Sequence, residues 1–172
     1  ACLCNITDNA ASADIKGIEA EFTFAATDNL RFLLSGSYVD ATYQDFLESA
    51  INPTTGTRLD SSGNRLQRTP ETQVSAGVDY TLGMARFNLN YTWQSDMYWA
   101  TDNIAKEPSY GLVDGRISFG PDDRSWAVAL WGKNLTDEEY RNWGIDFGSL
   151  GFTGDVFGEP RTYGLDVSYT YQ

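Results

Sequence analysis

Strict alternation of apolar and polar residues recurs seven times along this chain of 172 residues, and it constrains the fold more than any other feature. The first instance includes Ile18, Glu19, Ala20, Glu21 and Phe22. A period of two residues is typical of a β-strand with one apolar and one polar face. We predict seven such strands, over residues 17–24, 30–38, 73–82, 86–94, 112–119, 126–133 and 162–171.

The connections between these strands alternate between short and long. The short ones carry turn residues, such as Asp28-Asn29, Gly83-Met84 and Gly120-Pro121. The long ones are polar segments over residues 44–70, 95–109 and 136–161. In an up-and-down meander, all the short turns would lie at one end of the sheet and all the long loops at the other. Alternation alone also fits a soluble sandwich, but this asymmetry matches outer-membrane barrels.

We therefore predict an all-β chain, an antiparallel up-and-down meander of about seven to eight strands that is part of a transmembrane outer-membrane β-barrel. Aromatic residues make up 14% of the chain, and many are predicted on the apolar face near strand ends, where membrane-interface girdles lie. The residues in these positions are Tyr38, Tyr91, Trp93, Trp126, Tyr169 and Tyr171.

The charged residues exclude several classes of function. Lys and Arg total 12 against 24 Asp and Glu, a net charge of −12 that argues against a nucleic-acid partner. The chain has no His, so it lacks an imidazole base, and Cys2 and Cys4 are too few for a zinc site. Paired carboxylates such as Glu19 and Glu21 are expected to line a water-filled lumen. We predict no enzyme activity, no cofactor and no metal.

Three sequence motifs resemble the C-terminal barrel of TonB-dependent outer-membrane receptors. They are Ile-Lys-Gly-Ile-Glu at 15–19, Trp-Gly-Lys-Asn-Leu-Thr-Asp-Glu-Glu-Tyr at 131–140 and Gly-Glu-Pro-Arg-Thr-Tyr-Gly at 158–164. Each also has a physical interpretation. Asn134 and Asp137 supply turn chemistry at a strand exit, Pro160 precedes the final strand, and Gly17 and Gly164 permit a close backbone approach or a bend.

The resemblance implies a ligand-gated importer. The family forms a 22-stranded barrel around an N-terminal plug. It takes up siderophores, cobalamin, glycans or similar large solutes, with energy delivered by the TonB protein through a short N-terminal box. The implied partners are outer-membrane lipid, the rest of the receptor, TonB through the missing N-terminal region, and a solute such as a ferric siderophore or glycan.

The chain departs from the family pattern because it contains no plug, no TonB box and too few strands to close the barrel. We therefore expect residues 1–172 to be a C-terminal segment of a longer receptor in the cell outer membrane. The family's aromatic terminal strand guides barrel assembly, and the corresponding residues here are Tyr163, Leu165, Val167, Tyr169 and Tyr171. Two alternatives stay open, a secreted β-sandwich that binds carbohydrate and a small outer-membrane barrel that transports nothing.

Contacts with a solute are expected on the long loops, since loop aromatics stack on sugars and aromatic chelators. Arginines there would attract an anionic ferric chelate. The candidate ligand-binding residues are Tyr43, Arg58, Arg65, Tyr98, Trp99, Trp143 and Phe147.

Overall fold

The computed structural model describes residues 12–51, 55–123, 125–147 and 152–171. Its main feature is one antiparallel sheet of seven strands, each hydrogen-bonded to the next one in the order β1-β2-β5-β6-β9-β10-β13. These strands are β1 (Ser12–Thr27), β2 (Leu30–Asp45), β5 (Thr72–Leu82), β6 (Ala85–Gln94), β9 (Tyr110–Phe119), β10 (Trp126–Lys133) and β13 (Thr162–Tyr169). The predicted fold class and the seven predicted strands are confirmed.

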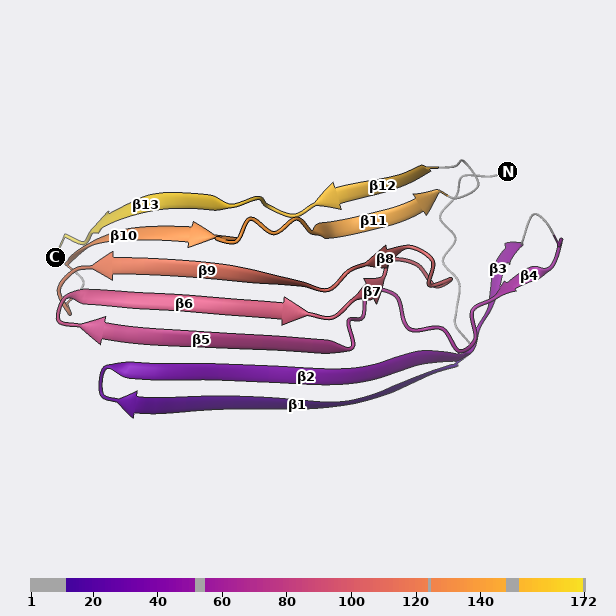
Figure 1. Ribbon diagram of the computed structural model, residues 1–172, viewed down its shortest axis with the longest axis horizontal. Coiled ribbons are helices and arrows are strands. Elements are labelled where there is room, and N and C mark those ends of the chain that lie inside the picture. Colours follow the sequence, from indigo (N-terminus) through magenta and orange to yellow (C-terminus); the bar gives the residue numbers. More distant parts are fainter. Residues whose placement is uncertain (1–11, 52–54, 124, 148–151, 172) are drawn as a thin grey trace.

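Three shorter hairpins occupy the segments that the sequence indicated only as long loops. They are β3 (Leu47–Ile51) with β4 (Arg58–Asp60), β7 (Met97–Tyr98) with β8 (Lys106–Glu107), and β11 (Arg141–Phe147) with β12 (Phe152–Phe157). Figure 1 shows all three beyond one end of the main sheet, whereas the short turns lie at the opposite end. The predicted separation of long and short connections is therefore confirmed. We call the end with the hairpins the loop end.

The register of the seven strands gathers their apolar side chains on one face. One row crosses the sheet through Tyr80, Phe87, Ile117, Leu130 and Leu165, each opposite the next on the neighbouring strand. The Tyr80 and Phe87 rings stack with centroids 6.1 Å apart. Because side chains alternate along every strand, the charged and amide side chains of these strands gather on the other face.

Strands β1 and β2 are longer than the sequence predicted. Each has 16 residues, whereas about 9–11 residues suffice to cross a bilayer as a tilted strand. In the additional part the apolar face carries Asp14 and Lys16, which form an ion pair at 3.6 Å. The opposite face carries Ala13 and Ile15 there, so the polar and apolar faces exchange places and the alternation changes phase. The backbone ladder nevertheless continues through Lys16 and its partner Asp40.

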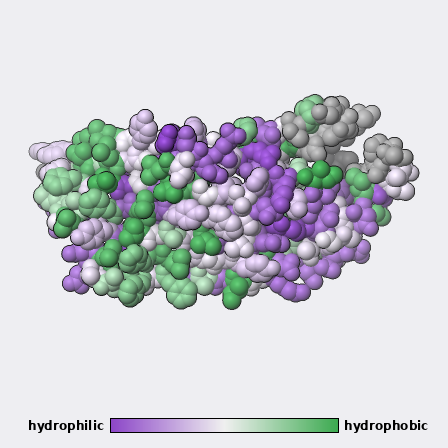
Figure 2. All heavy atoms as spheres, in the orientation of Figure 1, coloured by the Kyte–Doolittle hydropathy of each residue, from purple (hydrophilic) through white to green (hydrophobic). Residues whose placement is uncertain are grey.

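The apolar face of the sheet is exposed to a degree that a water-soluble domain does not tolerate. Ile18 has 72% of its surface exposed and Val167 71%. Burying such a side chain is worth about 1.5–3 kcal/mol, so the face needs an apolar environment outside this chain. In Figure 2 hydrophobic residues gather toward the short-turn end and hydrophilic ones toward the loop end. None of the described residues forms a helix that could span a membrane.

Candidate functional site at the loop end

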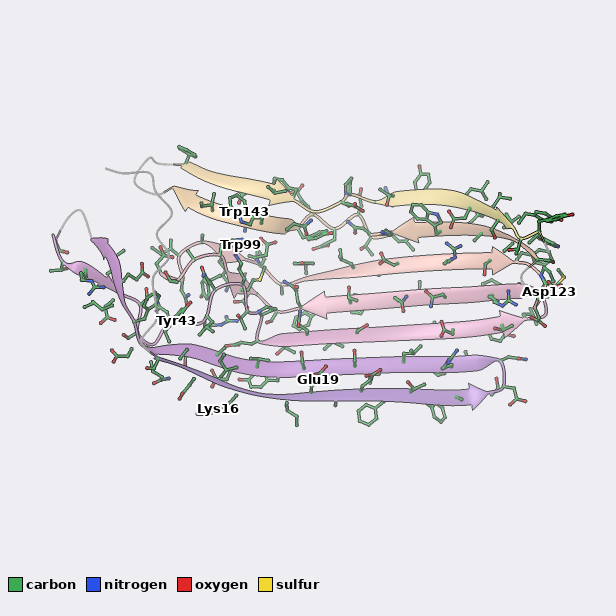
Figure 3. All side chains as sticks on the ribbon, turned by 180° about the vertical axis from the view of Figure 1, so that it is seen from behind. Lys16, Glu19, Tyr43, Trp99, Asp123 and Trp143 are labelled. Atoms are coloured by element: carbon green, nitrogen blue, oxygen red, sulfur yellow. The ribbon has the colours of Figure 1, made fainter. Side chains whose placement is uncertain are left out.

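Most of the buried side chains lie at the loop end rather than in the sheet. Buried apolar residues there include Tyr43, Phe46, Met97 and Trp99, and Glu107 is a buried charged residue. Figure 3 shows Tyr43, Trp99 and Trp143 at this end, far from Asp123 in a short turn. The loops therefore form a packed structure of their own, and the geometry of this structure decides what they can bind.

The first part of this structure is built on the end of β2. The ring of Tyr43 packs against Phe46 with centroids 4.9 Å apart, and the Tyr43 N–H donates to the carbonyl of Asn64 at 2.9 Å. Arg58 lies on β4, where its Nε donates to the carbonyl of Glu48 at 2.6 Å and its Nη2 donates to the carbonyl of Leu47. Tyr43 is thus buried, whereas the exposed side chain of Arg58 on β4 binds backbone carbonyls of β3 and so stabilises the β3–β4 hairpin.

Glu48 links this hairpin to the next loop. One of its carboxylate oxygens, Oε1, accepts hydrogen bonds from Ser61 Oγ and Thr101 Oγ1, each at 2.5 Å. Asn64 Nδ2 also donates to the carbonyl of Thr101 at 2.8 Å. Ser61 and Thr101 are 40 positions apart in the sequence, so these bonds hold two loops together.

Arg65 also connects the same two loops. Its guanidinium lies 3.2 Å from Glu71 and 3.0 Å from Asp96, and its charge sits over the ring of Tyr98, 5.4 Å from the centroid. Its backbone exchanges two hydrogen bonds with the side chain of Asn103. Arg65 is therefore a cation whose charge is already balanced by carboxylates of this chain.

Asp96 receives a second cation. Lys106 Nζ lies 3.2 Å from Asp96 Oδ2 and 5.9 Å from the centroid of the Tyr98 ring. Burial opposes ionisation of Asp96, but the hydrogen bonds and charges of Lys106 and Arg65 outweigh it and lower the pKa of that carboxyl. Tyr98 is half-buried beneath the two cations.

Trp99 connects the β7–β8 hairpin to the β11–β12 hairpin. Only 4% of its surface is exposed. Its indole lies flat against Gly144, so closely that a Cβ at Gly144 would come within 2.9 Å of the ring. The indole Nε1–H is buried without a hydrogen-bond partner among the described residues. The adjacent Trp143 keeps 36% of its surface exposed, so the two tryptophans differ sharply in accessibility.

A buried ion pair completes this second connection. Arg141 Nε donates to Glu107 Oε2 at 2.5 Å, its backbone N–H donates to Glu107 Oε1 at 3.0 Å, and its Nη1 lies 3.3 Å from Asp155. Burial by itself would lower the pKa of Arg141, but the hydrogen bond and charge of Glu107, joined by Asp155, raise it. Strands β8, β11 and β12 are therefore held together by charge-assisted hydrogen bonds, the strong kind.

Asn134 anchors the base of the third loop. It adopts a left-handed conformation with φ 48°, its Oδ1 accepts from the Glu138 N–H at 2.8 Å, and its Nδ2 donates to the carbonyls of Glu138 and Glu159. Its own N–H donates to Asp114 at 2.9 Å. Asp137 is also left-handed, with φ 58°. The turn chemistry predicted for Asn134 and Asp137 is confirmed.

For two glycines the sequence predicted either a close backbone approach or a bend, and the structure shows a close approach at both, by backbone at Gly17 and by a side chain at Gly164. A Cβ at Gly17 would lie 2.6 Å from the carbonyl oxygen of Tyr38 on the paired strand. A Cβ at Gly164 would lie 2.5 Å from the ring of Trp131, whose Nε1 donates to Asp166 at 3.0 Å. These glycines therefore let neighbouring groups pack closely within the sheet.

Below the loops, the polar face of the sheet carries charged and amide side chains in contact with one another. Arg31 lies 3.6 Å from Asp79, which accepts from Asn88 at 2.6 Å. Farther along the sheet, Arg116 donates to Asp166 at 2.7 Å. Toward the loops the same face has a shallow hollow of about 350 Å³. Its lining includes Glu19, Ser35, Ser37, Gln73, Ser75 and Thr92.

The seven candidate ligand-binding residues therefore differ in accessibility. Trp143 and Arg58 are exposed, and Tyr98 is half-buried. Arg65 is bound by carboxylates, and Tyr43 and Trp99 are buried. The side chain of Phe147 lies outside the described residues, as do Cys2 and Cys4. Among residues 12–51, 55–123, 125–147 and 152–171, no cluster of His, Cys, Asp or Glu side chains could hold a metal ion.

Sequence reasoning missed Glu48, Glu107 and Arg141, which hold the loops to one another. Glu107 and Arg141 are 34 positions apart, and neither lies in a motif. Asn134 had a local signal, since an asparagine directly after a strand is a common turn residue. Four of the five residues of the predicted terminal strand lie on β13 at the free edge of the sheet, whereas Tyr171 follows the strand, which ends at Tyr169 rather than at residue 171. All five side chains are strongly exposed, and they belong to Tyr163, Leu165, Val167, Tyr169 and Tyr171.

Comparison with known proteins agrees with this geometry. The family described as "TonB dependent receptor-like, beta-barrel" matches residues 2–135. The chain is 28% identical to the ferric-pyoverdine M114 receptor PbuA of Pseudomonas sp. (strain M114), in a match that covers 95% of this chain and 19% of PbuA.

Two solved structures share the fold. The siderophore receptor PiuA from Acinetobacter baumannii has a TM-score of 0.77 at 19% identity, covering 92% of this chain and 22% of PiuA. The ferripyoverdine receptor of the outer membrane of Pseudomonas aeruginosa has a TM-score of 0.64 at 17% identity, covering 90% of this chain and 19% of that receptor. This chain thus spans about a fifth of the length of the relatives it matches. The exposed apolar face, the plan of loops and turns and the family match agree, and the chain belongs to the TonB-dependent receptor β-barrel family of the outer membrane.

Proposed function

We propose that this chain is the C-terminal wall segment of an outer-membrane receptor that imports a ferric siderophore. In this proposal the polar face borders the lumen, the apolar face meets lipid, and the loop end forms part of the outer mouth. The rest of the barrel and a plug complete the receptor, and TonB supplies energy through a region outside this chain. The chain contributes binding and a wall, and no catalytic step.

The observation that carries this proposal is the joined structure of the three loops. Glu48 and Arg65 connect the first loop to the second, and Glu107 with Trp99 connects the second to the third. A continuous wall of this kind holds side chains in fixed positions above the polar face, as a binding site for a large solute requires. PbuA is described as a ferric-pyoverdine receptor and PiuA as a siderophore receptor.

Trp143 is our first choice for a direct contact with the solute. It is a large exposed aromatic side chain on a hairpin held by the Arg141–Glu107 pair. Such a ring can stack on an aromatic or planar chelator without rearrangement. Tyr43, Trp99 and Arg65 are proposed to position the wall instead, because they are enclosed or already paired. Arg58, Tyr98 and Phe147 stay as candidate contacts.

Uptake of radioactive iron by cells that carry the full-length receptor tests this proposal. The receptor is expressed in a strain without its own siderophore receptors, and ⁵⁵Fe is offered on a panel of ferric siderophores, pyoverdines included. We expect uptake of at least one ferric siderophore, loss of that uptake without TonB, and retained binding at the cell surface. Uptake of a glycan, without uptake of any ferric siderophore, would contradict the proposal that the solute is a siderophore.

Trp143→Ala in the same receptor tests the contact. Removing a stacked aromatic contact worth about 1–2 kcal/mol should weaken siderophore binding by roughly 5- to 30-fold. The matched control is Ile104→Ala, which truncates another exposed apolar loop residue, 72% exposed, in the loop between β7 and β8. Unchanged affinity in Trp143→Ala, or equal losses in the two variants, would contradict the role given to Trp143.

A further inference from the structure

Two glycines interrupt the apolar face of the sheet at one place. Gly115 of β9 and Gly132 of β10 lie directly opposite each other in the register. Their outer neighbours in the same row are Leu89 of β6 and Tyr163 of β13. Every other apolar-face position of this row carries a side chain. Leu135 occupies part of the space that the two glycines leave between Leu89 and Tyr163, and the rest of that space stays open.

The depression is part of an apolar groove of about 680 Å³, within the range of about 300–1,000 Å³ that small-molecule sites occupy. Ile117 and Leu130, one row closer to the short-turn end, form its lower part. Leu135 closes the upper part from the third loop. A Cβ at Gly115 would lie 3.3 Å from Leu135 Cδ1, and one at Gly132 would lie 2.5 Å from Leu135 Cδ2.

Leu135 is held in this position by the backbone. Its N–H donates to the carbonyl of Val113 at 2.8 Å, and it follows Asn134, the anchor of the third loop. Its side chain is nevertheless 39% exposed on the apolar face. The groove is therefore bounded at its sides by Leu89 and Tyr163 and at its loop end by Leu135, and it is open on the apolar face of the sheet.

The groove opens onto the surface that this family presents to membrane lipid, so its surroundings are hydrocarbon. An empty groove would leave its lining without packing contacts, which costs free energy, and a flexible saturated chain can enter where a rigid neighbour cannot. The glycine pair lies on the loop side of the Ile117–Leu130 row, with Gly132 one residue from the loop end of β10 and Gly115 in the middle of β9. Tyr163, 80% exposed, stands at the groove with a hydroxyl that can reach toward a headgroup.

We propose that this groove is a specific seat for one acyl chain of a lipid in the outer leaflet, held between Leu89 and Tyr163 beneath Leu135. A lipid in this seat packs against the roof residue next to Asn134, so it stabilises the base of the third loop from the membrane side. The seat is thus a lipid site distinct from the general lipid contact of the barrel.

Filling the groove tests the proposal in the full-length receptor. Gly115→Leu places a side chain in the depression, and the only contact below 3.4 Å that its Cβ makes is with the flexible end of Leu135. The matched control is Gly36→Leu on the same apolar face, where a Cβ meets nothing closer than 3.7 Å. Neither glycine has a left-handed φ, so the backbone accepts both changes. Native mass spectrometry of receptors extracted in mild detergent counts the lipids retained per receptor.

We expect the unmodified receptor and Gly36→Leu to retain one tightly held lipid that Gly115→Leu loses. Equal lipid retention by Gly115→Leu and the unmodified receptor would overturn the proposal, and so would the absence of retained lipid in both. A crosslink between Tyr163 and a second receptor copy would also overturn it, because protein rather than lipid would then lie at the groove. If Gly115→Leu fails to assemble, Leu135→Ala takes its place, since it removes the roof and leaves the strands intact. That variant should exchange the lipid several-fold faster, and an unchanged exchange rate would likewise overturn the proposal.

Discussion

The sheet and the loop end of this chain obtain their stability in opposite ways. The sheet has regular backbone pairing across seven strands. Within the described residues, however, nothing covers its apolar face, and the outer edges of β1 and β13 are unpaired. The loop end has only short strands, yet it contains most of the buried side chains, and its charges pair within the chain. The sheet thus depends on lipid and neighbouring strands, whereas the loops depend on contacts of their own.

Because of this difference, the sheet and the loop end should respond differently to substitutions. Substitutions in the loop end should open the loops and leave the sheet formed, and they should act similarly in detergent and in membranes. Substitutions on the apolar face should depend on the surrounding solvent. The predictions below test this contrast in the full-length receptor, and hydrogen exchange detected by mass spectrometry reports each loop separately.

Trp99→Ala should have the largest effect. Truncation of a buried tryptophan typically costs about 3–5 kcal/mol, and here it removes the side chain that packs the second loop against Gly144 of the third. Exchange should rise in β7, β8 and β11 and stay unchanged in β5 and β6. Trp99→Phe keeps an aromatic ring and removes an unpaired buried N–H, so it should lose much less. Equal losses in the two variants would contradict the packing role.

Glu107→Ala should cost about 3 kcal/mol of local stability, because it leaves the partly buried Arg141 without its main partner. Exchange in β11 and β12 should increase. The control is the double variant Glu107→Leu with Arg141→Leu, since replacement of both charges by apolar groups is often close to neutral. A double variant as unstable as the single one would show that the unpaired charge is not the cause.

Asn134→Ala should cost about 2–3 kcal/mol, from its side-chain hydrogen bonds at about 0.5–1.5 kcal/mol each and from the left-handed backbone. Asn134→Gly separates the two contributions, because glycine accepts this φ but cannot make the side-chain bonds. We expect Asn134→Gly to recover about 1 kcal/mol relative to Asn134→Ala, measured by exchange at residues 136–147. Identical stabilities would assign the whole effect to the hydrogen bonds.

The smallest effect is a dependence on pH at Asp96. Its pKa is lower in the folded loops than in the unfolded chain, so its contribution to stability is fully present above the unfolded value of about 3.9. That contribution is lost as the pH falls through the lower folded value. Near-ultraviolet circular dichroism should therefore show the connection between the first and second loops weakening only below about pH 4. Asp96→Asn should remove this acid transition, and an unchanged transition in that variant would refute the assignment.

The same contrast explains how much could be predicted from the sequence. The seven strands, their two faces and the two ends follow from alternation, because one face must be apolar over the full height of the membrane. This alternation changes phase at Asp14 and Lys16, which lie on the face that is apolar in the rest of the strand, and the strand extension there was missed. The aromatic positions on the apolar face were visible for the same reason as the strands.

The loop end was predictable only in part. Asn134 was found because turn chemistry is local, whereas the Glu107–Arg141 pair joins residues that only the folded chain brings together. Hairpins as short as β7 and β8, two residues each, leave no periodic signal. Trp99 and Trp143 look alike in the sequence, and their different accessibility is decided by Gly144 packing against one of them.

The central claim is that the two faces of the sheet meet different solvents, lipid on one side and a polar lumen on the other. Ile117 and Ser118 are neighbours on β9 and lie on opposite faces. Ile117→Lys and Ser118→Lys therefore place the same charge at nearly the same depth, and folding of the receptor into lipid vesicles measures the cost. We predict that Ile117→Lys loses about 2–4 kcal/mol of folding free energy and Ser118→Lys less than about 1 kcal/mol. Equal losses, or a larger loss for Ser118→Lys, would contradict the account.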